Sequence, residues 1–276
     1  MGLSQFAECT VIFACAIDPA EKFIKEVVSM QAEISTRPDY SVVIPMKNEE
    51  GNIHLLLDGL AAACEAGRYE VVMVDDGSTD NTPNVIRAAI ADHPWLKLVR
   101  HPISGGQSSA VHSGVKAASG AIICTMDGDG QNPPAEVPNL VAPFLAPDCP
   151  ATLGLVAGQR VKRQDTLSKK LASKFANGLR GYILKDNTRD TGCGLKAFRR
   201  DTFLEIPYFN NMHRYLPAMF NAYGWDVAHV DVTHAGRYSG SSNYTNFNRA
   251  MVGIYDLIGV GWLIKRRKIT KPVEDE

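Results

Sequence analysis

The chain of 276 residues is predicted to fold as an α/β protein with a mostly parallel central sheet and helices on both faces. Three observations favour this class. Strand-like segments alternate with helix-like segments, the strand-like segments are almost continuously apolar, and 45% of the residues are hydrophobic. Continuously apolar strands indicate a sheet that is covered on both faces, which is typical of parallel sheets. The length fits one such domain with appendages, or two small domains.

The alternation is clearest in the first half of the chain. The β-branched run Tyr40–Pro45 predicts a strand that proline ends, and a similar apolar run follows Gly120. Ile53, Leu56 and Leu60 recur at the spacing of a helix. The expected strands are 40–45, 69–74, 96–99 and 121–126, and the expected helices are 52–66, 82–92 and 110–118.

The pattern is less regular after Pro133 and Pro134. Two further apolar runs predict strands over 153–158 and 227–232. Between them we expect an amphipathic helix over 167–184, a tight polar loop over 190–194 and mostly helical structure over 203–222. No internal repeat and no low-complexity linker divides these segments.

The two ends of the chain suggest separate segments. Residues 1–38 contain a short apolar run without preceding basic residues, so they resemble neither a signal peptide nor a membrane span. They are either an accessory helix or an extension upstream of a start at Met30. The expected organisation is therefore an N-terminal extension, 1–38, a catalytic domain, 39–245, and a C-terminal segment, 246–276.

The C-terminal segment joins an apolar stretch, 247–264, to a basic cluster that begins at Lys265. Asp256 interrupts the stretch, which is short for a membrane span. An amphipathic helix on a membrane surface, with basic residues facing anionic lipid, is therefore favoured. The alternative is a helix packed on the core with a solvated basic tail.

Charge and cysteine content exclude some functions. The formal net charge of −1 gives no overall field that would attract nucleic acid, so no nucleic-acid partner is expected. The six cysteines are scattered and form no Cys-x-x-Cys pair, which is typical of reduced thiols in a cytosolic protein.

Asp127-Gly128-Asp129 directly follows the expected strand 121–126. Gly128 permits a turn after which both carboxylates can face one cation, and oxygen ligands suit Mg²⁺ or Mn²⁺ beside a diphosphate. A lone pair of this kind is usually a solvated turn. Here two more polar turns, 45–50 and 75–80, follow neighbouring strands. Because ligands bind beyond the carboxyl ends of parallel strands, the three turns together predict a site.

Three motifs in this order resemble family 2 glycosyltransferases with a GT-A fold. They are Val43-Ile44-Pro45-x-x-Asn48-Glu49-Glu50, Val74-Asp75-Asp76-Gly77-Ser78-x-Asp80 and Asp127-Gly128-Asp129-Gly130-Gln131-x-Pro133-Pro134. The resemblance covers about residues 39–245 and is strongest to the dolichol- and polyprenyl-phosphate sugar transferases. It implies an inverting, metal-dependent transfer of a sugar from a nucleotide-diphosphate donor to a polyprenyl-phosphate carrier. It also implies a peripheral location at the cytoplasmic face of the membrane.

The resemblance assigns the donor side of the site. Asp129 and Gln131 match the metal ligands, and Asp127 matches a residue between metal and donor. Asp76 matches a residue that binds the nucleobase, although a turn or helix-cap role is the alternative. The residues implied for the nucleotide pocket are Pro45, Lys47, Glu49, Asp76 and Asp127.

Two features of the donor side leave alternatives open. Lys47 stands where the family often has tyrosine, so it either meets a phosphate or an acidic sugar, or it is simply exposed. Gly105-Gly106 is either a phosphate cradle or a flexible turn.

The resemblance also assigns the acceptor side. The residues that match the acceptor-phosphate ligands are Arg160, Lys169, Ser173 and Arg237, with Lys169 in place of a more common arginine. Asp190 matches an acidic residue near the sugar. It would be a general base for a hydroxyl acceptor, or only an orienting group for a phosphate dianion that is already nucleophilic. The implied catalytic set is Asp127, Asp129, Arg160 and Asp190.

Two other functions remain as alternatives. One is a family 2 transferase that acts on a hydroxyl group of a saccharide or lipid. The other is a non-catalytic scaffold that binds a nucleotide sugar, against which the intact set of Asp127, Asp129 and Gln131 argues.

Overall fold

The computed structural model describes residues 37–65, 68–161, 180–181, 183–184, 186, 188, 190–233 and 246–268, and only the backbone of residues 246–252. Apart from Arg37, these residues belong to one compact unit, Pro38–Glu276. Residues 1–36 of the expected N-terminal extension and most of the expected helix 167–184 therefore lie outside the described residues.

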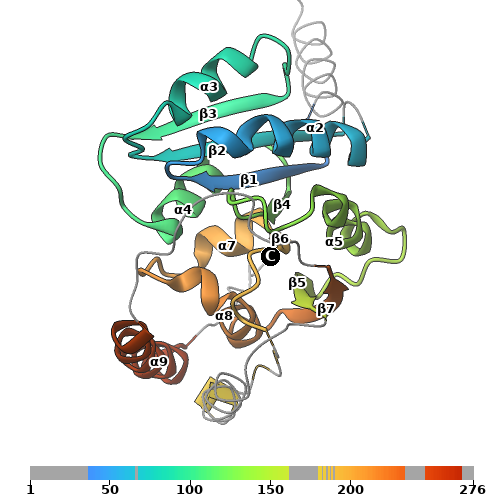
Figure 1. Ribbon diagram of the computed structural model, residues 1–276. Coiled ribbons are helices and arrows are strands. Elements are labelled where there is room, and N and C mark those ends of the chain that lie inside the picture. The colour runs from blue at the N-terminus through green and yellow to red at the C-terminus, as the bar shows by residue number, and fades with distance from the viewer. Residues whose placement is uncertain are drawn as a thin grey trace, which may run out of the picture. The chain divides into compact units, whose positions relative to one another are not determined.

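Seven strands of the described residues form one sheet, in the order β3-β2-β1-β4-β6-β5-β7 (Figure 1). All neighbouring strands are parallel except at β6, which is antiparallel to both β4 and β5. The predicted mostly parallel sheet is thus confirmed. The strands are β1 (Tyr40–Met46), β2 (Tyr69–Asp76), β3 (Leu96–His101), β4 (Ile122–Thr125), β5 (Leu153–Arg160), β6 (Lys196–Arg199) and β7 (Asp226–Val232).

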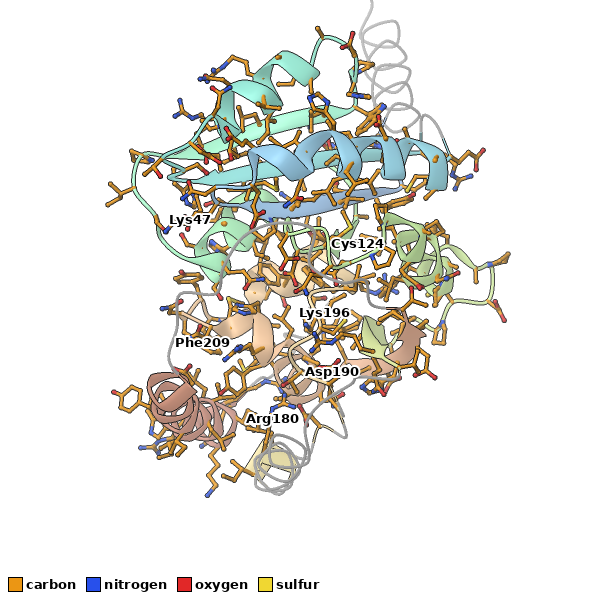
Figure 2. The ribbon with its side chains drawn as sticks, viewed as in Figure 1. Lys47, Cys124, Arg180, Asp190, Lys196 and Phe209 are labelled. Atoms are coloured by element: carbon orange, nitrogen blue, oxygen red, sulfur yellow. The ribbon has the colours of Figure 1, made fainter. Side chains whose placement is uncertain are left out.

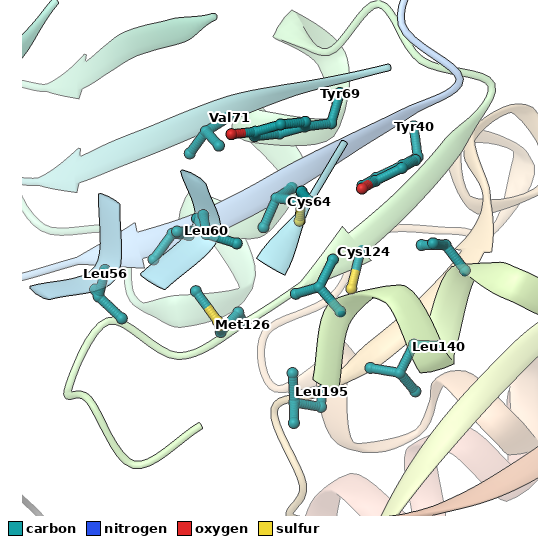
Figure 3. Close-up of a cluster of buried hydrophobic side chains, with 14 of the residues drawn as sticks. Tyr40, Leu56, Leu60, Cys64, Tyr69, Val71, Cys124, Met126, Leu140 and Leu195 are labelled. Carbon is teal, nitrogen blue, oxygen red and sulfur yellow. The ribbon is translucent and has the colours of Figure 1, made fainter. Parts of the chain in front are cut away.

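One face of the sheet is covered by α2 (Ile53–Ala63), α3 (Thr82–Ala89) and α5 (Val137–Leu145). Leu56, Leu60 and Leu140 of these helices join Tyr40 and Val71 of the strands in one buried cluster (Figure 3). Burial of each large aliphatic side chain stabilises the fold by about 1.5–3 kcal/mol relative to exposure. The apolar helix stripes read from the sequence therefore form the first half of the core.

The other face is covered by α4 (Gln107–Ala117), α7 (Arg200–Glu205) and α8 (Leu216–Ala222). Val43 and Val72 alternate along their strands with residues of the first cluster and point to this face. Phe198 of β6 stacks on Phe203 of α7 with ring centroids 4.9 Å apart. Both faces of the sheet are thus buried, as the continuous apolar strands predicted.

The structure differs from the prediction at β6 and over residues 203–222. β6 has four residues, two of them charged, so neither apolar length nor strict alternation marks it. Helical structure between α7 and α8 is interrupted over residues 206–215, where only the short η3 (Met212–Arg214) forms. Pro207 disfavours a continuing helix, and Asn211 adopts a left-handed backbone with φ of 65°. The expectation of mostly helical structure is wrong in this middle part.

The last described element is α9 (Asn246–Arg266). Leu257 and Val260 are buried and join the second core cluster. Asp256 accepts a hydrogen bond from Asn211, with 3.0 Å between Nδ2 and Oδ2. Within the described part of the chain, no helix combines the length and apolarity needed to cross a bilayer.

Candidate active site at the carboxyl edge of the sheet

The strand register brings the predicted turns to one edge of the sheet. Met46, the last residue of β1, lies beside Asp75, the residue before the last of β2. Thr125, at the end of β4, lies opposite Lys196, with which β6 begins. β5 runs in the same direction as β4 and ends at Arg160, so its end faces this edge as well. Because β3 and β7 are parallel to β2 and β5, the edge gathers the carboxyl ends of six strands and the amino end of β6.

The turn after β4 packs against the end of β1. A Cβ atom on Gly128 would lie 2.8 Å from the carbonyl oxygen of Pro45 and would overlap the sulfur of Met46. Only glycine fits this approach, which explains the residue between the two aspartates. Asp129 then accepts a hydrogen bond of 3.1 Å from the backbone amide of Gln131, so the turn closes on itself.

Asp127 follows β4, the middle strand of the sheet. Its Oδ1 accepts a hydrogen bond of 2.7 Å from Nε2 of Gln107, at the start of α4. Burial raises the pKa of Asp127, and the nearby charge of Asp129 raises it further, whereas Lys196 opposes the rise. Two carboxylates that repel each other in a partly dry place favour a bound cation.

The donor atoms available for such a cation are oxygens. The described residues hold no cluster of three His, Cys, Asp or Glu side chains suited to a metal. The candidate set is instead the two carboxylates of Asp127 and Asp129 with the side-chain amide of Gln131. Carboxylate and amide oxygens match the preference of Mg²⁺ and Mn²⁺, which complete their shells with water or phosphate.

Asp76 is surrounded by hydrogen-bond donors, and its side chain is only 5% exposed. Its Oδ1 lies 2.7 Å from Nδ1 of His101 and accepts a bond of 2.8 Å from the amide of Gly105. Its Oδ2 accepts bonds of 2.7 Å from Ser104 Oγ and 2.8 Å from the amide of Gly106. Burial alone would raise the pKa of Asp76, but these bonds outweigh it and lower the pKa.

The glycine pair therefore serves a turn. The amides of Gly105 and Gly106 both donate to Asp76, and Gly106 has a φ of 85° that favours glycine. This arrangement contradicts the interpretation of the pair as a phosphate cradle, because the donors that would hold a phosphate are already bound. The pair instead fixes the loop that leads into α4.

Residues 47–49 form the rim next to this loop. Nζ of Lys47 donates a hydrogen bond of 3.0 Å to Ser104 Oγ, so this exposed lysine is linked through Ser104 to Asp76. Asn48 is left-handed, with φ of 56°, and its Oδ1 accepts a bond of 2.8 Å from the amide of Thr79. The amide of Glu49 donates to Thr82 Oγ1 at 3.0 Å. These bonds join the first two predicted turns into one wall.

Arg160 and Asp190 form a two-pronged ion pair. Nε and Nη2 of the guanidinium lie 2.6 and 2.8 Å from the two carboxylate oxygens, and the side chains are 16% and 15% exposed. Hydrogen bonding to Asp190 raises the pKa of Arg160. Both oxygens of Asp190 are thus engaged by a cation, whereas Nη1 of Arg160 lies outside the pair.

Lys196 is a site residue that the sequence patterns did not reveal. It is labelled in Figure 2 and is only 3% exposed. Its Nζ donates to the carbonyl oxygen of Cys193, and its charge acts on Asp127. Burial lowers the pKa of Lys196, while Cys193, Asp127 and Asp190 work in the opposite direction. A lysine beside a polar loop is usually exposed. The one signal of burial in the sequence is that Lys196 directly precedes the apolar Ala197 and Phe198.

His213 lies behind the start of α4. Its Nδ1 is 2.8 Å from Ser108 Oγ, and burial, followed by the charges of Lys196 and Arg214, lowers the pKa of His213 to about 3. The ring is therefore neutral at physiological pH.

Three predicted acceptor-phosphate ligands, Lys169, Ser173 and Arg237, lie outside the described residues.

Comparison with known proteins gives consistent matches. Two curated relatives, from Photorhabdus laumondii and Yersinia pestis, are each named undecaprenyl-phosphate 4-deoxy-4-formamido-L-arabinose transferase. Each is 34% identical over 222 residues, which cover 79% of this chain. The matched region spans 66% of the length of each relative, slightly under two thirds.

Solved structures agree in fold. Glucosyl-3-phosphoglycerate synthase from Mycobacterium tuberculosis, crystallised with Mn²⁺, UDP and glucosyl-3-phosphoglycerate, superposes with a TM-score of 0.62 at 20% identity. The match covers 86% of this chain and 83% of that one. The fold is thus the predicted GT-A fold.

The sequence also matches the family model of glycosyl transferase family 2 over residues 41–206, more than half of the chain. The chain therefore belongs to glycosyl transferase family 2.

Proposed function

We propose that the protein is an inverting, metal-dependent glycosyltransferase that moves a sugar from a nucleotide-diphosphate donor to a polyprenyl-phosphate carrier. The observation that carries this proposal is the meeting of Asp127, Asp129 and Arg160 at one edge of the sheet. An acidic turn suited to a cation and a diphosphate there lies beside a guanidinium suited to a second phosphate. The names of the relatives support the choice of acceptor.

The donor would occupy the side formed by β1, β2 and α4. Asp127, Asp129 and Gln131 would hold a divalent cation, which supplies positive charge for the departing diphosphate. Pro45, Lys47 and Glu49 would line the nucleotide. Asp76 would reach the nucleobase directly only by giving up a hydrogen bond. We therefore propose that Asp76 shapes the nucleotide pocket through the Ser104–Gly106 loop.

The acceptor would occupy the side formed by β5. Nη1 of Arg160 would bind its phosphate, helped by Lys169, Ser173 and Arg237. A phosphate dianion is nucleophilic without a base, and its attack opposite the departing diphosphate inverts the anomeric carbon. Asp190 would then orient Arg160 rather than remove a proton, because both of its oxygens already face the guanidinium.

Transfer to a lipid carrier requires access to a membrane, and α9 offers a surface for it. Ile254, Ile258 and Trp262 recur at intervals of four along α9 and are exposed, and the adjacent Tyr255 is 81% exposed. The exposed Lys265 and Arg266 follow at the end of the helix. We propose that this face rests on anionic lipid at the cytoplasmic side of the membrane.

The acceptor and the metal can be tested in one assay. Purified protein is incubated with a panel of nucleotide sugars, including a nucleotide-linked 4-deoxy-4-formamido-L-arabinose, and undecaprenyl phosphate, with Mg²⁺, Mn²⁺ or a chelator. We expect metal-dependent formation of a lipid product that releases its sugar in mild acid. Asp129→Ala is expected to abolish transfer, while the variant still shows the cooperative thermal unfolding of a folded protein.

Other outcomes of this assay would favour the alternatives. A sugar product stable to mild acid would favour transfer to a hydroxyl group. Metal-dependent binding of UDP without transfer to any acceptor in the panel would favour the scaffold.

The membrane surface is tested by flotation with vesicles that contain anionic lipid. Ile258→Glu should reduce binding, because it places a charge in the middle of the exposed apolar face. Leu55→Glu is the matched control, since Leu55 is an exposed apolar residue on α2. Equal flotation of both variants and wild type would contradict the proposed surface.

A further inference from the structure

The segment Asp190–Lys196 is bonded to two neighbouring strands, β5 and β4, and also within itself. Arg160 of β5 binds Asp190, and the amide of Gly158 donates to the carbonyl oxygen of Leu195 at 3.0 Å. From β4, Oγ1 of Thr125 donates to the carbonyl oxygen of Gly194 at 2.8 Å. Within the segment, Lys196, the first residue of β6, donates to the carbonyl oxygen of Cys193. Such a density of bonds leaves the segment little freedom to move.

Gly194 is the point at which this segment touches the site. A Cβ atom added to Gly194 would overlap the carboxylate of Asp127, with both oxygens and the carboxyl carbon in its way. The backbone of Gly194 therefore forms the wall against which this carboxylate rests. The same carboxylate accepts a hydrogen bond of 2.7 Å from Nε2 of Gln107. Contacts from two segments far apart in the chain, at Gly194 and at Gln107, thus help to set its orientation.

Lys196 is an unexpected group with which to secure this wall. A buried ammonium loses its hydration, so a single carbonyl partner compensates it poorly. The carboxylates of Asp127 and Asp190 compensate it further, as their effect on the pKa of Lys196 indicates. The ammonium thus holds the backbone at Cys193 through a hydrogen bond and favours the ionised forms of Asp127 and Asp190.

We propose that Gly194 and Lys196 are positioning residues for the donor site: Gly194 sets the orientation of the Asp127 carboxylate, and Lys196 holds Gly194 in place through Cys193. This inference rests on the proposed function, because the part of Asp127 in donor binding is itself proposed.

The test is calorimetric titration of UDP into the full chain, with and without Mn²⁺. Gly194→Ala should weaken Mn²⁺-dependent binding of UDP about 10- to 100-fold, as is usual when a partner that orients a metal ligand is lost. Gly181→Ala is the matched control, because a Cβ atom there meets nothing within 4 Å. Melting temperatures of both variants report whether the fold is retained.

Two further variants separate positioning from folding. Thr125→Val keeps the shape of the side chain but removes the donor to Gly194, so it should also weaken Mn²⁺-dependent binding of UDP. This variant provides the test if Gly194→Ala fails to fold. Lys196→Met should raise KM for the donor more than it lowers kcat, and Lys196→Arg, which keeps charge and donors, should recover part of the loss.

The outcomes are distinguishable. If the wild type binds no UDP in the presence of Mn²⁺ and transfers no sugar, the proposed function fails. If the wild type binds but folded Gly194→Ala and Thr125→Val bind within twofold of it, the positioning role is overturned while the function stands. An equal rise in KM for the donor in Lys196→Met and Lys196→Arg would overturn the proposal that the ammonium holds Gly194 in place.

Discussion

Replacing Asp76 with asparagine is expected to destabilise the fold by about 3 kcal/mol. The amide nitrogen of asparagine must replace one of the two oxygens. In either orientation it faces a backbone amide, that of Gly105 or of Gly106, which then meets a donor instead of an acceptor. A buried donor left without a partner costs about 1–3 kcal/mol, and hydrogen bonds to a charged group, worth about 1.5–3 kcal/mol, fall to about 1 kcal/mol.

Thermal unfolding without ligand measures this effect. For a domain of this size, about 3 kcal/mol corresponds to a fall in Tm of roughly 6–12 °C. If Asp76 instead served chiefly to bind the nucleobase, the variant would melt like the wild type and lose only affinity for nucleotide. A change in Tm below about 2 °C would therefore refute the argument from the loop.

The same comparison has a pH dependence with a definite sign. The hydrogen bonds around Asp76 outweigh burial and lower its pKa. A carboxylate with a lowered pKa stabilises the fold fully above its ordinary value of about 3.9, and the contribution is lost as the pH falls through the folded-state pKa. The difference between wild type and Asp76→Asn should thus be largest near neutrality and shrink below about pH 4.

Three other predictions concern the edge of the sheet. Gly128→Ala should weaken UDP binding about 10-fold or more by pushing the turn away from Pro45, and an unchanged Kd would contradict this contact. His213, whose pKa burial and nearby charge lower to about 3, should show no NMR titration between about pH 5 and 8; a midpoint near 6.5 would show that the ring is solvated. Asp190→Asn should raise KM for the acceptor through Arg160 and leave the pH profile of kcat unchanged, whereas loss of its acidic limb would identify a general base.

Most of the sheet could be predicted because its local patterns agree with its burial. The run Tyr40–Met46 is apolar on both faces and lies in the middle of the sheet, so pattern and environment coincide. The same holds for β2 and β4. β6 could not be predicted, since it is short and its ends are charged. Its strand structure comes from pairing with β4 and β5, which were brought beside it by the rest of the fold.

The site residues also fall into those that could be predicted from the sequence and those that could not. Asp127, Asp129 and Asp76 follow strands in the sequence, so their common edge could be inferred from strand direction alone. Gly194 could not, because its importance depends on contact with a carboxylate that lies far from it in the chain. Its hydrogen bond from Thr125 spans 69 residues, a separation that leaves no periodic trace in the sequence.

The packing of β6 links the interior to the chemistry at the edge. Side chains alternate along a strand, so Lys196 and Phe198 share one face and Ala197 and Arg199 share the other. A slip of one residue would exchange the two faces and carry the ammonium to the wrong side of the sheet. The stacking of Phe198 on Phe203 opposes that slip, because a slipped strand would lose this contact. Substitutions at Phe198 that are chosen only to tune thermal stability should consequently alter donor affinity as well.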